Sequence, residues 1–254
     1  VHPKGRYFLK PGDVLTLVEP GGGGFGPAAR RSPARLAEDL REGFSFVRAR
    51  PVLWAPILLA YLLGFFGVSV VRIIALFARV VVRTTGGGYG LLVAASGLGA
   101  VVASVLVTAR ARPKELPRNM VVAALCFSAA LAGLGYARTY AWAFAALAAL
   151  GFGQMAFRSA VSTTLQLETP DRLRGRVVSV LTLDFSLWSI GALATGLLVD
   201  LLATRRAAGL GVTFEAAQPW ALGAAFTILG GVCAVCSLLL ARTILRTRVS
   251  ASEG

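Results

Sequence analysis

Six long apolar stretches, almost free of charge, constrain this chain more than any other feature. They run from Val52 to Ala75, Gly88 to Thr108, Asn119 to Tyr136, Thr139 to Leu165, Val177 to Leu198 and Trp220 to Leu240. A helix of about 20 residues, rising about 1.5 Å per residue, crosses a hydrocarbon core of about 30 Å. Lipid offers backbone amides no partner, and the stretches lack strand-like alternation. The sequence therefore predicts an all-α membrane protein, a six-transmembrane-helix bundle with the lipid bilayer as its partner.

The cationic residues gather in alternate loops, which predicts the orientation of the bundle. Sixteen lie before the first span, in the second-to-third and fourth-to-fifth loops, and after the sixth span, against five in the opposite loops: Arg79, Arg83, Arg138, Arg205 and Arg206. By the positive-inside rule, the richer side is cytoplasmic. We therefore expect a multi-pass protein of the plasma (inner) membrane with both termini cytoplasmic. The net charge of +14 reflects this topology and not nucleic acid, because no continuous basic face or arm is present.

The sequence contains no group of residues typical of an enzyme. Its single histidine is His2, and no serine or cysteine nucleophile has a candidate base. No Walker-type loop or metal-ligand cluster occurs. Cys126, Cys233 and Cys236 fall inside predicted spans, where thiols pack as small apolar groups. We expect no catalytic residue, no metal and no cofactor.

The chain before the first span divides into two parts. Residues 1–31 combine short β-prone pieces with turns and the glycine run Gly21 to Gly24, which predicts a soluble Gly-rich β/turn segment. Residues 32–50 predict an amphipathic cytoplasmic helix, because Ser32 suits an N-cap and the apolar residues that follow have helical spacing: Leu36, Leu40, Phe44 and Val47. A six-helix domain at 51–243 and a cytoplasmic tail at 244–254 complete the expected organisation.

Two motifs in residues 1–31 resemble the C-terminal tail of the hydantoinase B/5-oxoprolinase family. They are Pro11-Gly12-Asp13 and the turn from Glu19 to Gly26. The several-hundred-residue body of such an enzyme is absent from this sequence, so its hydrolytic activity is not carried over to this chain. We expect a mosaic or mispredicted gene start.

From Leu36 to Arg248 the chain resembles the C-terminal half of a major facilitator superfamily transporter. It is most similar to the branch with enterobactin-exporter-like and macrolide-efflux-like proteins. Four motifs carry the resemblance: Leu40 to Phe44, Gly88 to Gly99, Gly151 to Gln154 and Pro170 to Val177. The resemblance implies half of a major facilitator fold and efflux of small molecules by alternating access. It also implies a partner, either a missing N-terminal six-helix half or a second copy.

The motif from Pro170 to Val177 is the most specific of the four. It contains a P-D-x-x-R-G-R pattern whose matched positions are Asp171, Arg174, Gly175 and Arg176. The resemblance places them in a cytoplasmic loop and implies a gate or hinge brace. Their chemistry agrees, because Asp171 can cap a helix or accept from an arginine, Gly175 permits close approach, and arginines reach carboxylates. Arg172 lies outside the matched positions, and we interpret it as a topology charge.

Two ionisable residues within the spans are candidates for a substrate or coupling site. Arg158 and Asp184 lie roughly 12–15 Å inside the cytoplasmic boundary on consecutive helices, as estimated from the rise per residue. Charged groups at this depth are expensive and commonly functional. A structural ion pair and a substrate- or proton-responsive pair are both open. Gln154, one turn from Arg158, is expected to line the same cavity.

Small residues at four-residue spacing predict faces where helices approach closely. Ala95, Gly99 and Ala103 form one such face, and Ala192 with Gly196 forms another. The overall hypothesis is half of a secondary active transporter that binds a small-molecule substrate and is driven by an ion gradient. The alternatives are a hydantoinase/5-oxoprolinase-derived fragment fused to a membrane anchor, and a non-transporting membrane scaffold.

Overall fold

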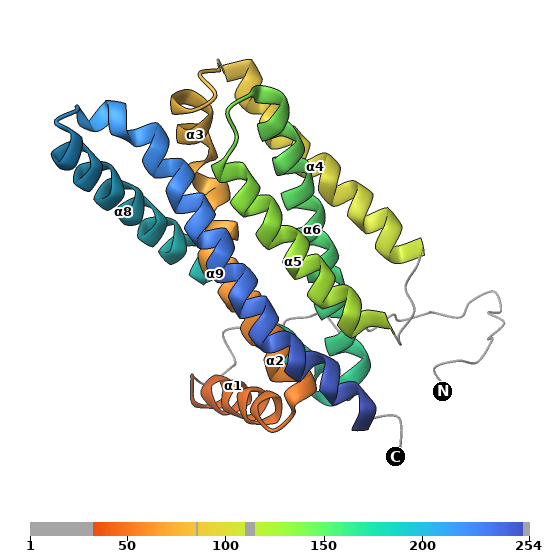
Figure 1. Ribbon diagram of the computed structural model, residues 1–254. Coiled ribbons are helices and arrows are strands. Elements are labelled where there is room, and N and C mark those ends of the chain that lie inside the picture. The colour runs from red at the N-terminus through yellow and green to blue at the C-terminus, as the bar shows by residue number, and fades with distance from the viewer. Residues whose placement is uncertain (1–32, 85, 110–114, 251–254) are drawn as a thin grey trace, which may run out of the picture.

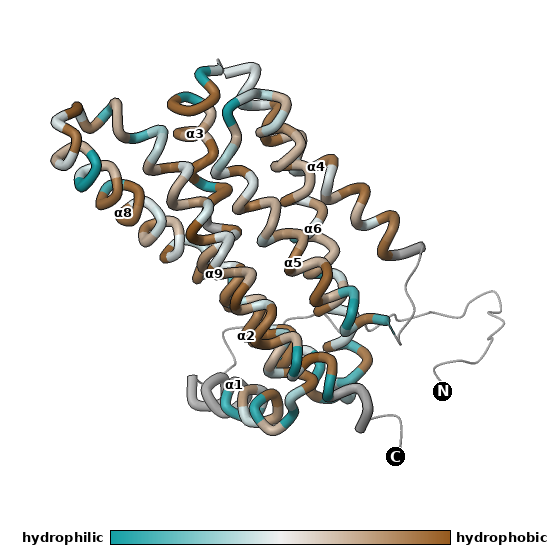
Figure 2. Tube along the Cα trace, viewed as in Figure 1, coloured by the Kyte–Doolittle hydropathy of each residue, from teal (hydrophilic) through white to brown (hydrophobic). Residues whose placement is uncertain are grey.

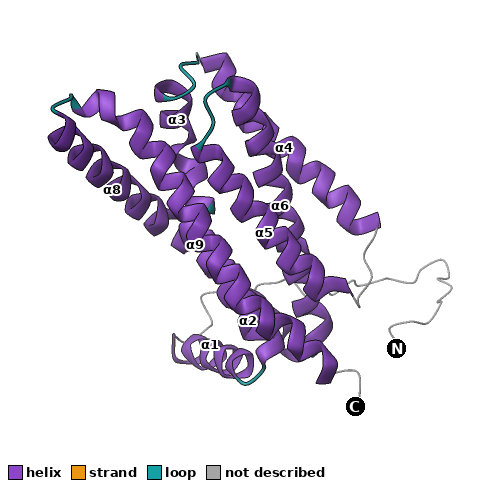
Figure 3. Ribbon diagram, in the orientation of Figure 1, coloured by secondary structure: helices purple, strands orange, loops and turns teal. Residues whose placement is uncertain are grey.

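The computed structural model describes residues 33–84, 86–109 and 115–250, which form helices joined by short loops (Figure 3). In chain order the elements are α1 (Pro33–Arg48), α2 (Pro51–Phe66), η2 (Val68–Ile73), α3 (Ile74–Val80), α4 (Gly86–Ala109), α5 (Leu116–Gly135), α6 (Tyr140–Glu168), α7 (Asp171–Thr182), α8 (Asp184–Leu210) and α9 (Phe214–Ser250). The Gly-rich segment at 1–31, with its hydantoinase-like motifs, lies outside the described residues.

Six spans among the described residues are long and apolar enough to cross a membrane. They are Pro51–Val80, Gly86–Val107, Leu116–Gly135, Tyr140–Glu168, Asp171–Leu210 and Phe214–Arg246. Apolar residues cover the middle of the bundle, and hydrophilic residues gather toward its ends (Figure 2). Large apolar side chains also lie on the outer surface, among them Leu98, Val101 and Leu239. Such a surface suits lipid, and the prediction of an all-helical membrane bundle is confirmed.

The helices pack in a definite order around the bundle. α6 packs between α4 and α5, α9 packs against α5, α8 and α2, and α2 also contacts α8 (Figure 1). Outside the spans, α1 lies across the end of the bundle, against α2 and α7, close to where α9 ends (Figure 1). The expected helix before the first span is therefore present, and it packs on the spans.

The first span is interrupted, although its sequence predicts one continuous helix. α2 ends at Phe66, and the 3-10 helix η2 leads into α3. Gly67 lies at the break, and a Cβ on it would collide with the Phe127 ring of α5. Phe127 is almost fully buried, so α5 covers the backbone at this point. Irregular backbone at membrane depth is tolerated where protein covers it.

The fifth span is also broken, at Leu183, between α7 and α8. The expected loop with the P-D-x-x-R-G-R motif is helical, because α7 already begins at Asp171. Pro170 precedes it as the N-cap residue, and no side chain caps the helix. The expectation that Asp171 caps this helix is therefore wrong. The second span also begins earlier than the expected Gly88, since α4 begins at Gly86.

One of the two predicted small-residue faces brings helices together. A Cβ on Gly99 would collide with the carbonyl oxygen of Ala148 in α6, and Ala95 and Ala103 are fully buried. Gly151 of α6 lies equally close to α4, through the carbonyl of Ser96. The face of Ala192 and Gly196 does not pack in this way, because a Cβ on Gly196 would meet open space. The buried face of α8 instead carries Gly191, Thr195, Val199 and Ala203.

Candidate functional site

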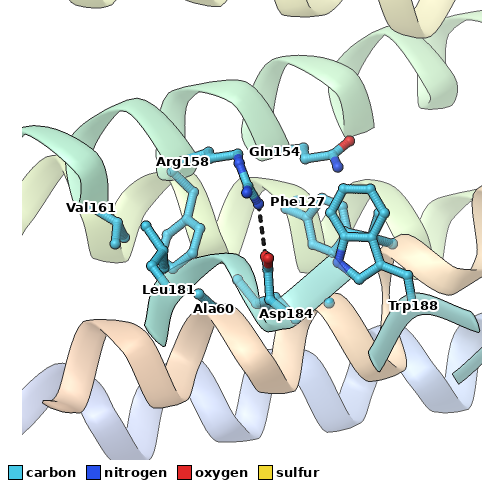
Figure 4. Close-up of a pocket in the computed structure, with 12 residues that line it drawn as sticks. Ala60, Phe127, Gln154, Arg158, Val161, Leu181, Asp184 and Trp188 are labelled. Atoms are coloured by element: carbon cyan, nitrogen blue, oxygen red, sulfur yellow. Dashed lines mark hydrogen bonds and ion pairs between the residues drawn. The ribbon is translucent and has the colours of Figure 1, made fainter. Parts of the chain in front are cut away.

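A buried ion pair lies between the fourth and fifth spans. Nη1 of Arg158, on α6, donates to Oδ2 of Asp184, on α8, over 2.7 Å (Figure 4). The Asp184 side chain is only 2% exposed, whereas that of Arg158 is 31% exposed. The two residues that the sequence analysis placed at one depth are therefore in direct contact. Removing either partner of such a pair would leave the other charge without compensation.

The break in the fifth span explains how Asp184 is held. Asp184 is the first residue of α8, so its carboxylate lies at the positive end of that helix dipole. The preceding turn is fixed from α2, because the hydroxyl of Tyr61 donates to the carbonyl oxygen of Val180. That carbonyl belongs to the last turn of α7 and also accepts from the amide of Leu183 over 3.3 Å. Tyr61 thus stabilises the break on which the placement of Asp184 depends.

Aromatic rings hold the other half of the pair. The guanidinium carbon of Arg158 lies 4.5 Å from the ring centre of Phe185 and 5.7 Å from that of Trp188. Both rings belong to the first turns of α8, beside Asp184. Cation–π contacts of this kind stabilise a partly desolvated cation. They also mean that the position of the arginine depends on the geometry of α8.

A small pocket of about 30 Å³ lies beside the pair, lined from six of the helical elements (Figure 4). Its polar lining consists of Gln154, Arg158, Asp184 and the indole of Trp188. Two buried polar atoms there have no hydrogen-bond partner in the structure: Oδ1 of Asp184 and Nε1 of Trp188. Buried polar groups are normally satisfied, so such atoms call for a further partner. The pocket therefore offers one acceptor and one donor to a small guest.

The broken first span forms the opposite wall of the pocket. Leu63 and Gly64 of α2 and Val68 of η2 line it. A Cβ on Gly64 would lie 2.8 Å from Nε1 of Trp188 and 3.9 Å from Cβ of Asp184. Only glycine therefore leaves room for the indole at this point. The interruptions of the first and fifth spans meet at the same pocket, a convergence that periodicity in the sequence does not reveal.

A second cluster of charges joins α1 to α7 at the end of the bundle. Glu42 of α1 accepts from Nη2 of Arg172 over 3.0 Å and also from Nη1 of Arg176. The two helices approach closely here, because a Cβ on Gly43 would lie 3.1 Å from Cβ of Arg176. Glu42 is 41% exposed, so the cluster is at the surface. We call Glu42, Arg172 and Arg176 the α1–α7 clamp.

The α1–α7 clamp differs from the residue roles expected of the motif. Arg174 makes a local ion pair with Asp171 over 2.7 Å and also donates to the carbonyl of Gln166. Gly175 meets open space, so the close approach expected of it is wrong and occurs at Gly43 instead. Arg172, interpreted as a topology charge, shares Glu42 with Arg176. Glu42 was within a matched motif, but no spacing rule links it to α7, 130 residues away.

The described residues contain no group of three or more His, Cys, Asp or Glu side chains that could hold a metal ion. The chemistry of the site therefore rests on the ion pair, the two unpartnered polar atoms and the aromatic rings. Buried charge pairs and interrupted helices within a membrane commonly mark binding sites in transporters.

The sequence profile described as Major Facilitator Superfamily matches residues 14–194. The match covers more than half of the chain, and the chain belongs to the Major Facilitator Superfamily. It is thus a member of a transporter family and not of an enzyme family. Comparison with curated proteins gave no match.

Among solved structures, the chain is similar to a bacterial homologue of the human lysosomal transporter Spinster, in an inward-facing and unoccupied conformation. The TM-score is 0.59 at 20% sequence identity. The similarity covers 88% of this chain and 54% of that transporter, so the chain spans about half of the transporter's length. At this identity the similarity establishes the fold, and it supports a fragment with six of the family's membrane helices.

Proposed function

We propose that the chain is one six-helix half of a secondary active transporter, which exports small molecules by alternating access and is driven by an ion gradient. The observation that carries this proposal is the Arg158–Asp184 pair at the point where two interrupted spans meet. Interrupted helices at mid-membrane commonly surround substrate and ion sites. Ionisable groups in the membrane commonly mark the pathway of a substrate or ion.

In this proposal Asp184 is the group that responds to a coupling ion or a cationic substrate. Its free oxygen, Oδ1, accepts the guest while Oδ2 holds Arg158. Protonation or ligand binding at Asp184 weakens its attraction for Arg158, and the arginine then relaxes onto Phe185 and Trp188. Gln154 lines the same pocket and supplies a further amide for substrate.

The proposed cytoplasmic gate lies at the α1–α7 clamp. Contacts between charged surface residues form in one conformer and break in another at low cost. Asp171 and Arg174 brace the start of α7 locally, and Glu42 ties α7 to α1 through Arg176. Because α7 ends at Thr182, two residues before Asp184, movement of the gate and rearrangement of the pocket involve the same element.

The finer identity follows from the resemblance described for the sequence. We place the chain in the enterobactin-exporter-like and macrolide-efflux-like branch, in the plasma (inner) membrane, with both termini cytoplasmic and amphipathic molecules as substrates. The remainder of the transporter is a second six-helix half or a second copy of this chain. The family match begins at residue 14, and this supports a family origin for much of 1–31 over a hydantoinase-derived one.

Proteoliposomes that contain the chain test this function. We expect a proton gradient to drive accumulation of a fluorescent amphipathic cation, and Asp184→Asn to reduce the rate at least tenfold. Arg242→Gln is the matched control, because Arg242 is an exposed charge at the far end of α9. The chain should also be tested when it is folded and paired with a second half. If it then transports none of a panel of such dyes, it is a non-transporting scaffold. Equal rates for native chain and Asp184→Asn would remove Asp184 from the mechanism.

A further inference from the structure

A second cavity lies outside the transport pocket, in the corner between α1 and the spans. It is a groove of about 320 Å³ with apolar walls. Its principal lining residues come from three helices: Phe44, Val47 and Arg48 of α1, Trp54 and Leu58 of α2, and Val180 of α7. We call this cavity the corner groove. Phe44 is 57% exposed and Leu58 is 39% exposed, so the groove opens at the surface of the described bundle.

The depth of the corner groove is that of a membrane interface. α1 lies across the end of the bundle, and α2 begins its crossing at Pro51, three residues before Trp54 (Figure 1). Tryptophan is enriched at this depth because its ring is apolar while its N–H is polar. The groove therefore lies where an acyl chain meets its headgroup.

Positive charge surrounds the mouth of the corner groove. Arg48 contributes apolar stem atoms to the wall, and the described residues place no carboxylate within ion-pair distance of it. Arg50, two residues further along the chain, does not line the groove, and its guanidinium lies 4.5 Å from the ring centre of Phe46. The nearest described acid on α1, Glu42, is already engaged by two arginines. Glu38 and Asp39 precede Arg48 by about 14 Å along the helix axis, at about 1.5 Å per residue.

The backbone adds to this positive field. α2 begins at the same corner, and no side chain caps its N-terminus. The N-terminal end of a helix attracts anions through its dipole. At this helix the dipole acts without free amides at most positions, because Pro51 has no N–H and the amides of Leu53 and Trp54 donate to the carbonyl of Arg50. We propose that the corner groove binds an acyl chain of an anionic phospholipid, whose phosphate pairs with Arg48 at the membrane surface. The ligand is a lipid rather than a free phosphate, because the walls of the groove are apolar.

This lipid would act on the gate, because the corner groove and the α1–α7 clamp share two helices. Val47, which lines the groove, is one helical turn from Gly43, which touches Arg176. Val180, on the α7 side of the groove, is the residue whose carbonyl Tyr61 holds. An acyl chain between α1 and α2 therefore supports the position of α7 in this conformation. This consequence rests on the proposed function, whereas lipid binding itself does not.

Trp54 gives a direct measurement. In a variant with Trp142, Trp188 and Trp220 replaced by phenylalanine, Trp54 is the one remaining tryptophan. The chain is reconstituted into phosphatidylcholine vesicles with a small fraction of phosphatidylglycerol or phosphatidylcholine brominated in the acyl chain. We expect the apparent affinity of the brominated anionic lipid for the Trp54 site to be roughly fivefold higher, since one arginine near the surface contributes about that factor. If the triple replacement prevents folding, the difference between the native chain and Trp54→Phe reports the same preference.

Arg48→Gln is expected to reduce the preference to about one, and Arg48→Lys to keep most of it. Arg242→Gln, at the same end of the bundle but outside the groove, is expected to keep it fully. Equal quenching by the two lipids in the native chain would overturn the proposal. Equal losses in Arg48→Gln and Arg242→Gln would mean general charge attraction and no site. Quenching by neither lipid would mean that protein, such as a second half, covers the groove.

Discussion

At the scale of single residues, the unequal burial of Arg158 and Asp184 determines what each contributes. The carboxylate is almost completely enclosed, whereas the guanidinium reaches the pocket surface between two aromatic rings. An arginine left alone can turn toward water, but a carboxylate left alone at this position cannot. The pair is therefore asymmetric, and its two single variants are not equivalent.

We expect Arg158→Ala to lower stability more than Asp184→Ala, because only the first leaves a fully buried charge without a partner. Removing one member of a fully buried pair costs about 3–5 kcal/mol, and partial exposure of Arg158 reduces the loss in Asp184→Ala. The double variant should recover part of the loss, because neither charge is stranded. Thermal unfolding midpoints in detergent measure all three. Losses that simply add in the double variant would show that the two residues do not interact.

Gly64 provides a steric test of the same pocket. Gly64→Ala is expected to displace the Trp188 indole, since the new Cβ would lie 2.8 Å from Nε1. Overpacking of this kind costs about 1–3 kcal/mol. Loss of the Trp188 contact should also lower dye transport in proteoliposomes.

Gly97→Ala is the matched control for this substitution. It makes the same change inside a membrane helix, and a Cβ on Gly97 meets open space. Its unfolding midpoint should stay the same or rise, because alanine favours helix over glycine. A Gly64→Ala variant as stable and active as Gly97→Ala would show that the Trp188 indole can move aside without loss of stability or transport.

At the scale of helices, the break in the fifth span between α7 and α8 connects the α1–α7 clamp to the pocket. α7 is a short element with a partner at each end: the α1–α7 clamp at its start, and Tyr61 at its last turn. Asp184 follows immediately on α8. A short helix held at both ends moves as a unit, so the clamp and the pocket are connected through α7 without any contact between their side chains.

Arg176→Ala or Glu42→Ala should release α1 from α7. A partly exposed ion pair contributes about 0.2–1 kcal/mol, so amide exchange in the second half of α1 is expected to rise by at most roughly fivefold. Arg172→Ala should give a smaller effect in the same direction, because Arg176 still holds Glu42. Hydrogen exchange by mass spectrometry measures the rates.

Arg174→Ala is the matched control for the α1–α7 clamp, because Arg174 pairs with Asp171 within α7. It removes the same charge from the same helix and should leave exchange in α1 unchanged. Faster exchange in α1 with Arg174→Ala, equal to that with Arg176→Ala, would attribute the effect to net charge instead of the contact with Glu42.

At the scale of the whole molecule, both ends of the described bundle lie on one side of the membrane, since six spans separate α1 from the end of α9. The excess of arginine at that end predicts that it is cytoplasmic. In a variant without native cysteines, Ser45→Cys on α1 should resist an impermeant thiol reagent applied to intact cells. Gly209→Cys, at the opposite end of α8, should react. The reverse pattern would invert the orientation.

Membrane thickness sets the length of each apolar stretch, and the need for backbone hydrogen bonds in lipid favours helices. Both are local properties, so the number of spans and their helical character could be predicted from the sequence alone. The depth of Arg158 and Asp184 also followed from counting residues, because a helix rises by a constant amount per residue. Similarly, Gly99 predicted a close approach between helices, because small residues on one face of a helix let a neighbouring backbone come near. Each of these inferences needs no knowledge of a distant segment.

Only the tertiary structure decided the rest. At Gly67, where the first span breaks, Phe127 of another span occupies the space of a side chain, and the partner of Glu42 is set by how α1 docks on α7. Gly175 and Gly196 have the same chemistry as Gly43 and Gly99, yet they face open space. Periodicity tells which residues share a face of a helix, but packing between helices decides what that face meets, because contacts between distant segments depend on the arrangement of the whole bundle.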